Sequence, residues 1–391
     1  MIPFARVLKY GNIADTPIEI IKMRCMHISW IALSSNGDLY GRGYGSFGDG
    51  QPYATWREDW FIIKSGVVDF WVNDSHQLLY IRTNDGKLSW CGDNRYRTGG
   101  TDSTLTTTFN PESAVINNLD IKRIIFNDGY ASLMVLSTGG ACYLMGSPRA
   151  WNGSTTVTPT WSNVANGILE IMSTGTNYFT IASNGVVNGG GQNLANILNT
   201  TASSGTFYTW PVSIGTANVN DMSVTTGQYA IKFRNSGSLN TYMGRGFGNT
   251  GIFGNGSQAD LKSTSVISSA WPELQQIIRQ SDLPAGTPPS KTYYYTPTSL
   301  YFMGTAPRSG SASTGSFVIT PEKLVVPFVP NDIVYIEVKQ NTVVVYTNGG
   351  KIYYAGLAFS SATVSNDAAQ FVEWTGWFDK FKINVTHDSM L

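Results

Sequence analysis

Two glycines six residues apart recur along this chain, and a sequence pattern with a period of roughly 50 residues is typical of folds built from repeated structural units. One clear copy is SSNGDLYGRG, which begins at Ser34, and another is TNDGKLSWCG, which begins at Thr83. Two copies are degenerate, since one has Pro297 in the turn and one has a seven-residue step from Gly237. The second glycines of the copies are Gly43, Gly92, Gly146, Gly191, Gly244, Gly304 and Gly356.

The spacing of the copies leaves no room for a second domain. Seven units of about 52 residues would occupy about 364 residues, and the chain has 391 residues. We therefore predict that residues 1–391 form a single domain.

Each unit contains the patterns of four short strands. An apolar inner strand opens the unit, as at residues 67–72, 274–278 and 333–338. A hairpin follows across an Asn-Gly or Asp-Gly turn, because these residues accept the positive φ angles of such turns. An outer strand, as at residues 59–64 or 112–117, completes the unit. Four-stranded antiparallel sheets repeated around an axis are the blades of a β-propeller, so the expected fold is an all-β single β-propeller.

The two ends of the sequence predict how the ring of blades closes. The segment FKINVTHDSML from Phe381 is similar to IKMRCMHISW from Ile21, so the last residues have the pattern of another inner strand. The segment PFARVLKY at residues 3–10 has the pattern of an outer strand. We therefore expect the N- and C-terminal segments to pair and close the propeller, with seven or eight blades.

The segment DGKLSWCGDN, residues 85–94, resembles the repeat of the regulator of chromosome condensation family, and weaker copies cover essentially the whole chain. This resemblance implies the β-propeller fold. It also implies one possible role, because the best studied members of the family promote nucleotide exchange on a small GTPase. Propellers host unrelated functions, so the fold alone does not assign that role.

Charge and hydropathy limit the partners of this chain. It carries 26 Lys and Arg against 26 Asp and Glu, and only 13% of its residues are charged, against roughly 25% in typical soluble proteins. A zero net charge excludes a generally basic nucleic-acid binder, which needs surplus Lys and Arg for phosphate contacts. No apolar run approaches the roughly 18 residues of a membrane span, and the first residues lack the layout of a secretory signal. We therefore expect no nucleic-acid partner, no membrane insertion and synthesis in the cytoplasm.

Motifs that would support enzymatic chemistry lack the context they need. The segments GYGSFG at Gly43 and GFGNTG at Gly246 match G-x-G-x-x-G, but neither precedes the helical pattern that a dinucleotide site requires. The three histidines and the scattered acidic residues show no catalytic or metal-ligand spacing. The three cysteines, Cys25, Cys91 and Cys142, lie in apolar runs, which predicts buried free thiols. The sequence thus predicts no catalytic residue, no cofactor and no metal.

Arginine and aromatic residues recur at or just after the second glycine of the repeat. Loops on a rigid scaffold commonly carry binding residues, and planar guanidinium and aromatic groups suit glycans or protein partners. The alternative is that these aromatic side chains pack between blades. The candidate binding residues are Arg42, Tyr44, Phe47, Arg95, Tyr96, Trp151, Arg245 and Phe247.

Two functions follow from these observations. The first is a non-enzymatic binding or structural module, because low charge and abundant Gly, Asn, Ser and Thr are similar to the composition of bacteriophage tail, whisker and receptor-binding proteins. Such a virion protein would present its loops, in several copies per particle, to a host-surface glycan or to a protein partner in a larger assembly. The second is an exchange factor or scaffold in the cytoplasm, which the family resemblance implies.

Overall fold

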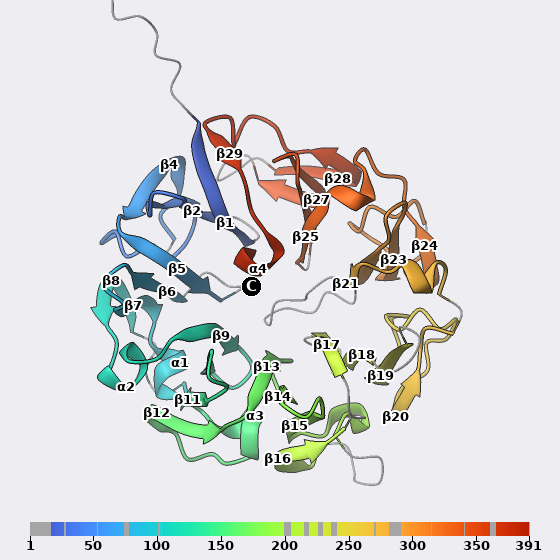
Figure 1. Ribbon diagram of the computed structural model, residues 1–391, viewed down its shortest axis with the longest axis horizontal. Coiled ribbons are helices and arrows are strands. Elements are labelled where there is room, and N and C mark those ends of the chain that lie inside the picture. The colour runs from blue at the N-terminus through green and yellow to red at the C-terminus, as the bar shows by residue number, and fades with distance from the viewer. Residues whose placement is uncertain are drawn as a thin grey trace, which may run out of the picture.

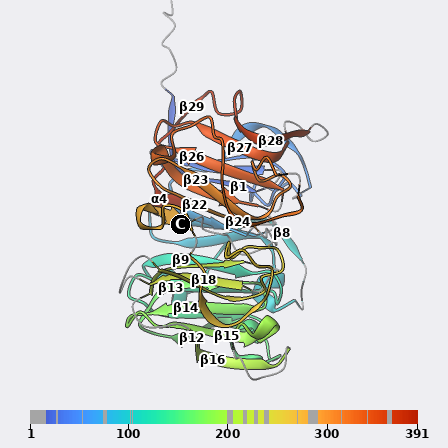
Figure 2. The same ribbon diagram turned by 90° about the vertical axis from the view of Figure 1, so that its right-hand side faces the viewer.

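The computed structural model shows seven antiparallel sheets arranged as blades around a common axis (Figure 1). Figure 2, turned by 90°, shows the ring of blades from the side. The predicted all-β propeller is thereby confirmed, and the number of blades is seven. The structure describes residues 17–26, 29–52, 54–73, 78–100, 102, 104–198, 205–214, 219–225, 230–235, 241–269, 271–280, 291–313, 315–339, 341–359 and 365–390.

In each blade the strands follow one another from the axis outward, each antiparallel to the next (Figure 1). Blades 1 to 4 are β1 (Ile18–Met26), β2 (Ser29–Ser34), β3 (Leu39–Gly43) and β4 (Arg57–Lys64); β5 (Val67–Val72), β6 (Leu78–Thr83), β7 (Leu88–Asp93) and β8 (Leu105–Pro111); β9 (Ile121–Asn127), β10 (Ser132–Ser137), β11 (Cys142–Gly146) and β12 (Thr158–Ala165); β13 (Ile168–Ser173), β14 (Asn177–Ala182), β15 (Val187–Gln192) and β16 (Phe207–Ser213).

Blades 5 to 7 are β17 (Val219–Thr225), β18 (Ala230–Asn235), β19 (Thr241–Gly246) and β20 (Leu261–Val266); β21 (Arg279–Gln280), β22 (Lys291–Tyr295), β23 (Leu300–Thr305) and β24 (Phe317–Lys323); β25 (Ile333–Val338), β26 (Thr342–Thr347), β27 (Ile352–Phe359) and β28 (Ser365–Glu373). A further strand, β29 (Phe381–Ile383), joins blade 1. The short helical turns are α1 (Arg95–Thr98), α2 (Ala114–Asn117), α3 (Arg149–Asn152), α4 (His387–Met390), η1 (Leu194–Asn196), η2 (Leu274–Gln276) and η3 (Pro330–Asp332).

Three details of the predicted repeat are wrong. Residues 112–117 are not an outer strand, because the buried Glu112 carboxylate accepts hydrogen bonds from Trp161 Nε1 and the Ser113 amide, and the chain turns into α2. Residues 274–278 are not an inner strand, since they follow a left-handed residue, Glu273 (φ 51°), and begin as η2. In blade 5 the repeat glycine is Gly246 (φ 110°) rather than Gly244, because Gly246 pairs with the first residue of β18.

The ring closes through the C-terminal segment, which lies between blades 7 and 1 and ends in α4 near the axis (Figure 1). The strand β29 pairs in parallel with the start of β1, so it extends blade 1 and does not begin an eighth blade. Aromatic side chains fill the junction: Trp30 of blade 1 meets Trp374 at 5.0 Å and Phe378 at 4.9 Å between ring centroids. The expected pairing of the terminal regions is present in this form, while residues 3–10 lie outside the described residues.

The hydrophobic core lies mainly between neighbouring blades rather than at one centre. One cluster joins Ile31 and Leu33 of blade 1 to Phe70 and Ile81 of blade 2. The three cysteines are buried free thiols, as predicted, and burial raises the pKa of Cys142 to about 12. Because each blade buries its faces against two neighbours, the closing junction determines whether blades 1 and 7 have a complete core.

Replacing Phe381 by Ala tests the closing junction. Phe381 is 8% exposed and meets Trp60 at 4.9 Å, so we expect Phe381→Ala to lower the free energy of unfolding by about 3 kcal/mol, as for other buried Phe-to-Ala changes. Chemical denaturation measures this loss. The neighbouring exposed change Lys382→Ala should alter stability by less than about 0.5 kcal/mol, and equal stability of the two variants would contradict a closing role for β29.

Candidate functional site on the loops after the second glycine

The loop after the second glycine crosses onto the next blade, as the loops of blades 2 and 3 show. Gly146 of blade 3 has φ 91°, and a Cβ atom there would lie 2.2 Å from the carbonyl oxygen of Tyr96 in the α1 loop of blade 2. At Gly191 of blade 4, a Cβ atom would lie 2.5 Å from the carbonyl oxygen of Ala150 in the α3 loop of blade 3. The repeated glycine is therefore required both by its backbone conformation and by the seating of the preceding blade's loop.

Four of the predicted binding residues are buried in these crossings. Phe47 is fully buried between blades 1 and 2, Tyr96 packs on Phe126 of blade 3, and Trp151 stacks on Trp210 of blade 4 at 4.5 Å. The fourth, Arg245, is 6% exposed, and its Nε donates to the carbonyl oxygen of Asn196, 2.8 Å away. These four side chains therefore pack at contacts between blades, as the packing alternative describes. Phe47, Tyr96 and Trp151 lie on loops that reach the next blade, whereas Arg245 lies on β19 and receives the η1 loop of blade 4.

Three of the predicted binding residues lie at the margin of the loops. The Arg42 guanidinium lies over the ring of Trp377, 4.0 Å from its centroid, and Tyr44 meets Trp56 edge on at 5.0 Å. Both side chains are half-buried, as is Phe247. The first contact attaches the end of β3 to the C-terminal segment, and the second joins the blade 1 loop to the residue that precedes β4.

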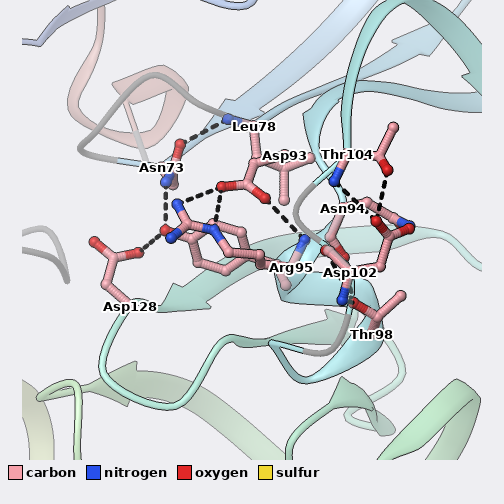
Figure 3. A network of polar contacts seen from close by, with 10 residues as sticks. Asn73, Leu78, Asp93, Asn94, Arg95, Thr98, Asp102, Thr104 and Asp128 are labelled. Carbon is pink, nitrogen blue, oxygen red and sulfur yellow. Dashed lines mark hydrogen bonds and ion pairs between the residues drawn. The ribbon is translucent and has the colours of Figure 1, made fainter.

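The eighth predicted residue, Arg95, is the exposed member of a polar network at blades 2 and 3 (Figure 3). The Arg95 guanidinium pairs with the buried Asp93 carboxylate at 2.5 Å, and 46% of the Arg95 side chain is exposed. This ion pair raises the pKa of Arg95, so the charge is held in place. Next to it, Tyr96 Oη accepts from Asn73 Nδ2 at 2.8 Å and donates to Asp128 Oδ1 at 2.5 Å. The network thus holds Arg95 and Asp128 close together on the face of the propeller that carries the loops after the second glycine.

Aromatic and guanidinium groups continue this stretch onto blade 4. Arg149 lies 5.1 Å from the ring centroid of Tyr130 and 4.8 Å from that of Phe207, and the Tyr130 hydroxyl donates to Gln192 Oε1 at 3.0 Å. These four side chains are half-buried. We call the combined surface the blade 2–4 patch; its residues are Arg95, Asp128, Tyr130, Arg149, Gln192 and Phe207.

Arg95 is the one residue of the blade 2–4 patch among the binding residues predicted from the sequence. Arg149 follows the second glycine of its repeat by three residues and could have been found by the rule that selected Trp151. Tyr130 and Phe207 could not, because they lie in a different loop and at the start of an outer strand, and only the seating of blade 3 on blade 4 brings them together.

Ion pairs link inner strands of adjacent blades at the channel. Lys22 Nζ of blade 1 lies 2.7 Å from Asp69 Oδ1 of blade 2, and Arg123 Nη1 of blade 3 lies 2.6 Å from Glu170 Oε1 of blade 4. Burial acts to raise the pKa of Glu170, but the positive charges of Arg123 and Lys122 outweigh it and lower the pKa below its ordinary value. Each pair joins residues 47 positions apart, about one repeat, so the charges serve blade-to-blade pairing.

A buried lysine lies between blades 5 and 6. Burial lowers the pKa of Lys232 to about 7, and its ammonium group donates to Thr292 Oγ1. A neutral lysine is a potential nucleophile. However, Lys232 has no exposed surface, so a substrate would have to displace the packing of blade 6 to reach it.

Within the described ranges, no three His, Cys, Asp or Glu side chains are grouped so as to hold a metal ion. In the same part of the chain, no helix is long and apolar enough to cross a membrane.

The fold is similar to that of solved propellers of the regulator of chromosome condensation type. Prp20p of Saccharomyces cerevisiae, whose structure was reported with its binding to Gsp1p and histones, has a TM-score of 0.61 at 11% identity over 81% of this chain and 79% of its own. Yeast RCC1 (Prp20) bound to Kap60 has a TM-score of 0.65 at 13% identity, with 92% and 84% covered. Human WBSCR16 has a TM-score of 0.62 at 12% identity, with 82% and 85% covered. No protein-family model and no curated protein sequence matches the chain.

Replacing Trp151 tests whether the loop after the second glycine joins blades 3 and 4. Trp151 is 5% exposed and stacks on Trp210, so Trp151→Ala is expected to lower the free energy of unfolding by about 3 to 5 kcal/mol. Urea denaturation followed by circular dichroism gives the loss. The control Thr155→Ala changes an exposed residue of the same loop and should cost less than about 0.5 kcal/mol. A Trp151→Ala variant as stable as this control would show that the stack does not join the blades.

The Glu170 ion pair predicts a pH dependence of stability. A carboxylate whose folded pKa is lowered stabilises the folded state above its unfolded pKa, and this contribution is lost as pH falls through the folded value. The ordinary pKa is 4.5, so the loss should develop below that pH. Glu170→Gln should therefore lower the thermal midpoint of unfolding at about pH 7. Between about pH 7 and about pH 3, the midpoint of this variant should fall less than that of the unmodified protein.

The matched control for this pH dependence is Glu373→Gln, which alters an exposed ion pair with Lys351. Exposed pairs contribute little to stability, so this variant should follow the unmodified protein at every pH. If Glu170→Gln also follows the unmodified protein, the channel pair does not stabilise the fold.

Proposed function

We propose that this chain is a non-enzymatic recognition module that binds a macromolecular partner through the blade 2–4 patch. One observation carries the proposal: exposed Arg95 is held by a buried carboxylate, and Arg149 is held between the rings of Tyr130 and Phe207. Arginine and aromatic residues in fixed positions are the residue types that dominate binding energy at protein interfaces. Their rigid attachment reduces the entropy lost on binding.

The similarity to yeast Prp20p supports the kind of function but not the partner. That protein was reported with its binding to Gsp1p and histones, so a propeller of this shape can serve as a binding scaffold. Zero net charge does not favour a histone-like or nucleic-acid partner here, because those contacts depend on complementary charge.

We propose a virion as the setting and the bacterial surface as the source of the partner. The support is compositional: few charged residues, with many Gly, Asn, Ser and Thr, as in phage tail, whisker and receptor-binding proteins. Several copies on one particle would convert a modest single contact into firm attachment through effective concentration.

The test measures binding of the purified chain to bacterial cells and to isolated envelope, with Arg95→Ala and Tyr130→Ala as variants. Each change is expected to weaken binding by about 30-fold, the effect of losing one hot-spot residue. The thermal midpoint of each variant checks that folding is intact. Lys87→Ala, an exposed change in the β6–β7 turn at the opposite end of the blade, should leave binding unchanged.

Two results would contradict the proposal. Binding that is unaffected by both patch variants would exclude the blade 2–4 patch. Absence of binding to cells and envelope, together with accelerated nucleotide release from a small GTPase, would favour the exchange-factor alternative that the family resemblance implies.

A further inference from the structure

A groove of about 320 Å³ lies between α3 and the outer strands of blade 3. It is separate from the blade 2–4 patch in the residues that form it. Leu144, Pro148 and Trp151 are buried and form its apolar part. The remaining lining residues are Asn152, Ser154, Thr156, Thr158, Ser162 and Val164.

The polar groups of the groove are available to a ligand. Ser154 Oγ accepts from the Thr156 amide at 3.1 Å, which leaves its hydroxyl hydrogen free to donate. The hydroxyls of Thr158 and Ser162 make no hydrogen bond to any other described residue. Asn152 Oδ1 accepts from the Ser154 amide at 2.9 Å, so the side-chain NH₂ of Asn152 remains a donor. The lining of the groove therefore offers both hydrogen-bond donors and acceptors to a ligand.

The groove is rigid and uncharged. None of its lining residues is Asp, Glu, Lys, Arg or His, so nothing in it would pair with a phosphate, a carboxylate or an ammonium group. Stacking of Trp151 on Trp210 at 4.5 Å fixes α3, and the Asn152–Ser154 turn fixes the adjoining wall. A ligand would thus meet preformed geometry, which reduces the ordering cost of binding.

We infer that this groove binds a neutral saccharide unit. A pyranose ring presents C–H groups on one side and hydroxyls at its edge, which match an apolar floor and a wall of hydroxyl and amide groups. The volume lies at the lower end of the range of small-molecule sites, enough for one or two sugar units. The inference rests on the proposed recognition function in one respect only: that function supplies the source of the sugar, a surface glycan.

The experiment uses the full chain and a panel of free neutral oligosaccharides built from glucose, galactose, mannose and N-acetylglucosamine, with a sialylated oligosaccharide as the anionic comparison. Saturation-transfer NMR identifies the sugars that bind, and calorimetry measures the dissociation constants. At least one neutral oligosaccharide is expected to bind, and the sialic acid itself should receive no saturation.

Two variants locate the binding. Thr158→Val keeps the shape of the side chain and removes a hydroxyl, so it should weaken binding by about fivefold, the effect of one neutral hydrogen bond. Ser162→Leu fills the groove and should abolish binding. The control Thr160→Val changes an exposed residue of the same strand that does not line the groove, and it should bind as the unmodified chain does.

The inference is overturned if no neutral oligosaccharide binds, or if Thr158→Val and Ser162→Leu both bind sugar as tightly as Thr160→Val. Preferential binding of the sialic acid or of a peptide in the groove would also overturn it. These outcomes are separable from failure of the proposed function. If Ser162→Leu binds cells as well as the unmodified chain does and Arg95→Ala does not, the blade 2–4 patch is supported. The saccharide groove is then rejected.

Discussion

The seating of each post-glycine loop against the next blade is the contact on which the observed arrangement depends. At Gly146 and Gly191 the preceding blade's backbone approaches so closely that a Cβ atom would lie 2.2 to 2.5 Å from a carbonyl oxygen. The close approach positions Tyr96 and Trp151 inside the neighbouring blade's core. A blade therefore depends on its neighbour for part of its core, as expected where repeated units cannot bury their faces alone.

The same crossings explain why the sequence predicted the repeat but not which side chains near the second glycine are exposed. A positive φ angle recurs at the second glycine of every unit, so the spacing of these glycines predicted seven units. At Gly146 and Gly191 there is also no space for a Cβ atom. Arginine and aromatic residues just after the glycine are buried between blades in one copy of the repeat and exposed on the surface in another. Arg95 is exposed while Tyr96, its neighbour, is buried, and strand periodicity does not distinguish two adjacent residues of a helical turn.

One of the wrong strand predictions, at residues 112–117, has its cause in a buried side chain. The apolar pattern at residues 112–117 favoured an outer strand, but the Glu112 carboxylate is buried against Tyr80 and Trp161 and draws the chain inward. Closure of the ring was predicted from the likeness of the two ends. Its form, a parallel strand beside a cluster of aromatic side chains, depends on contacts of Trp30 with Trp374 and Phe378. These two residues lie more than 300 positions from Trp30, so the contacts have no local signature.

The side chains of the proposed sites are held in fixed positions, and the chain has no net charge. Together these two properties favour recognition of uncharged or mixed-charge surfaces. Partly buried ion pairs such as Lys22–Asp69 use charges to join blades rather than to create an external field. Long-range electrostatic steering requires unbalanced charge, and this chain has none overall. Contact must then come from shape, stacking and short hydrogen bonds at fixed positions, which is the chemistry of both the blade 2–4 patch and the blade 3 groove.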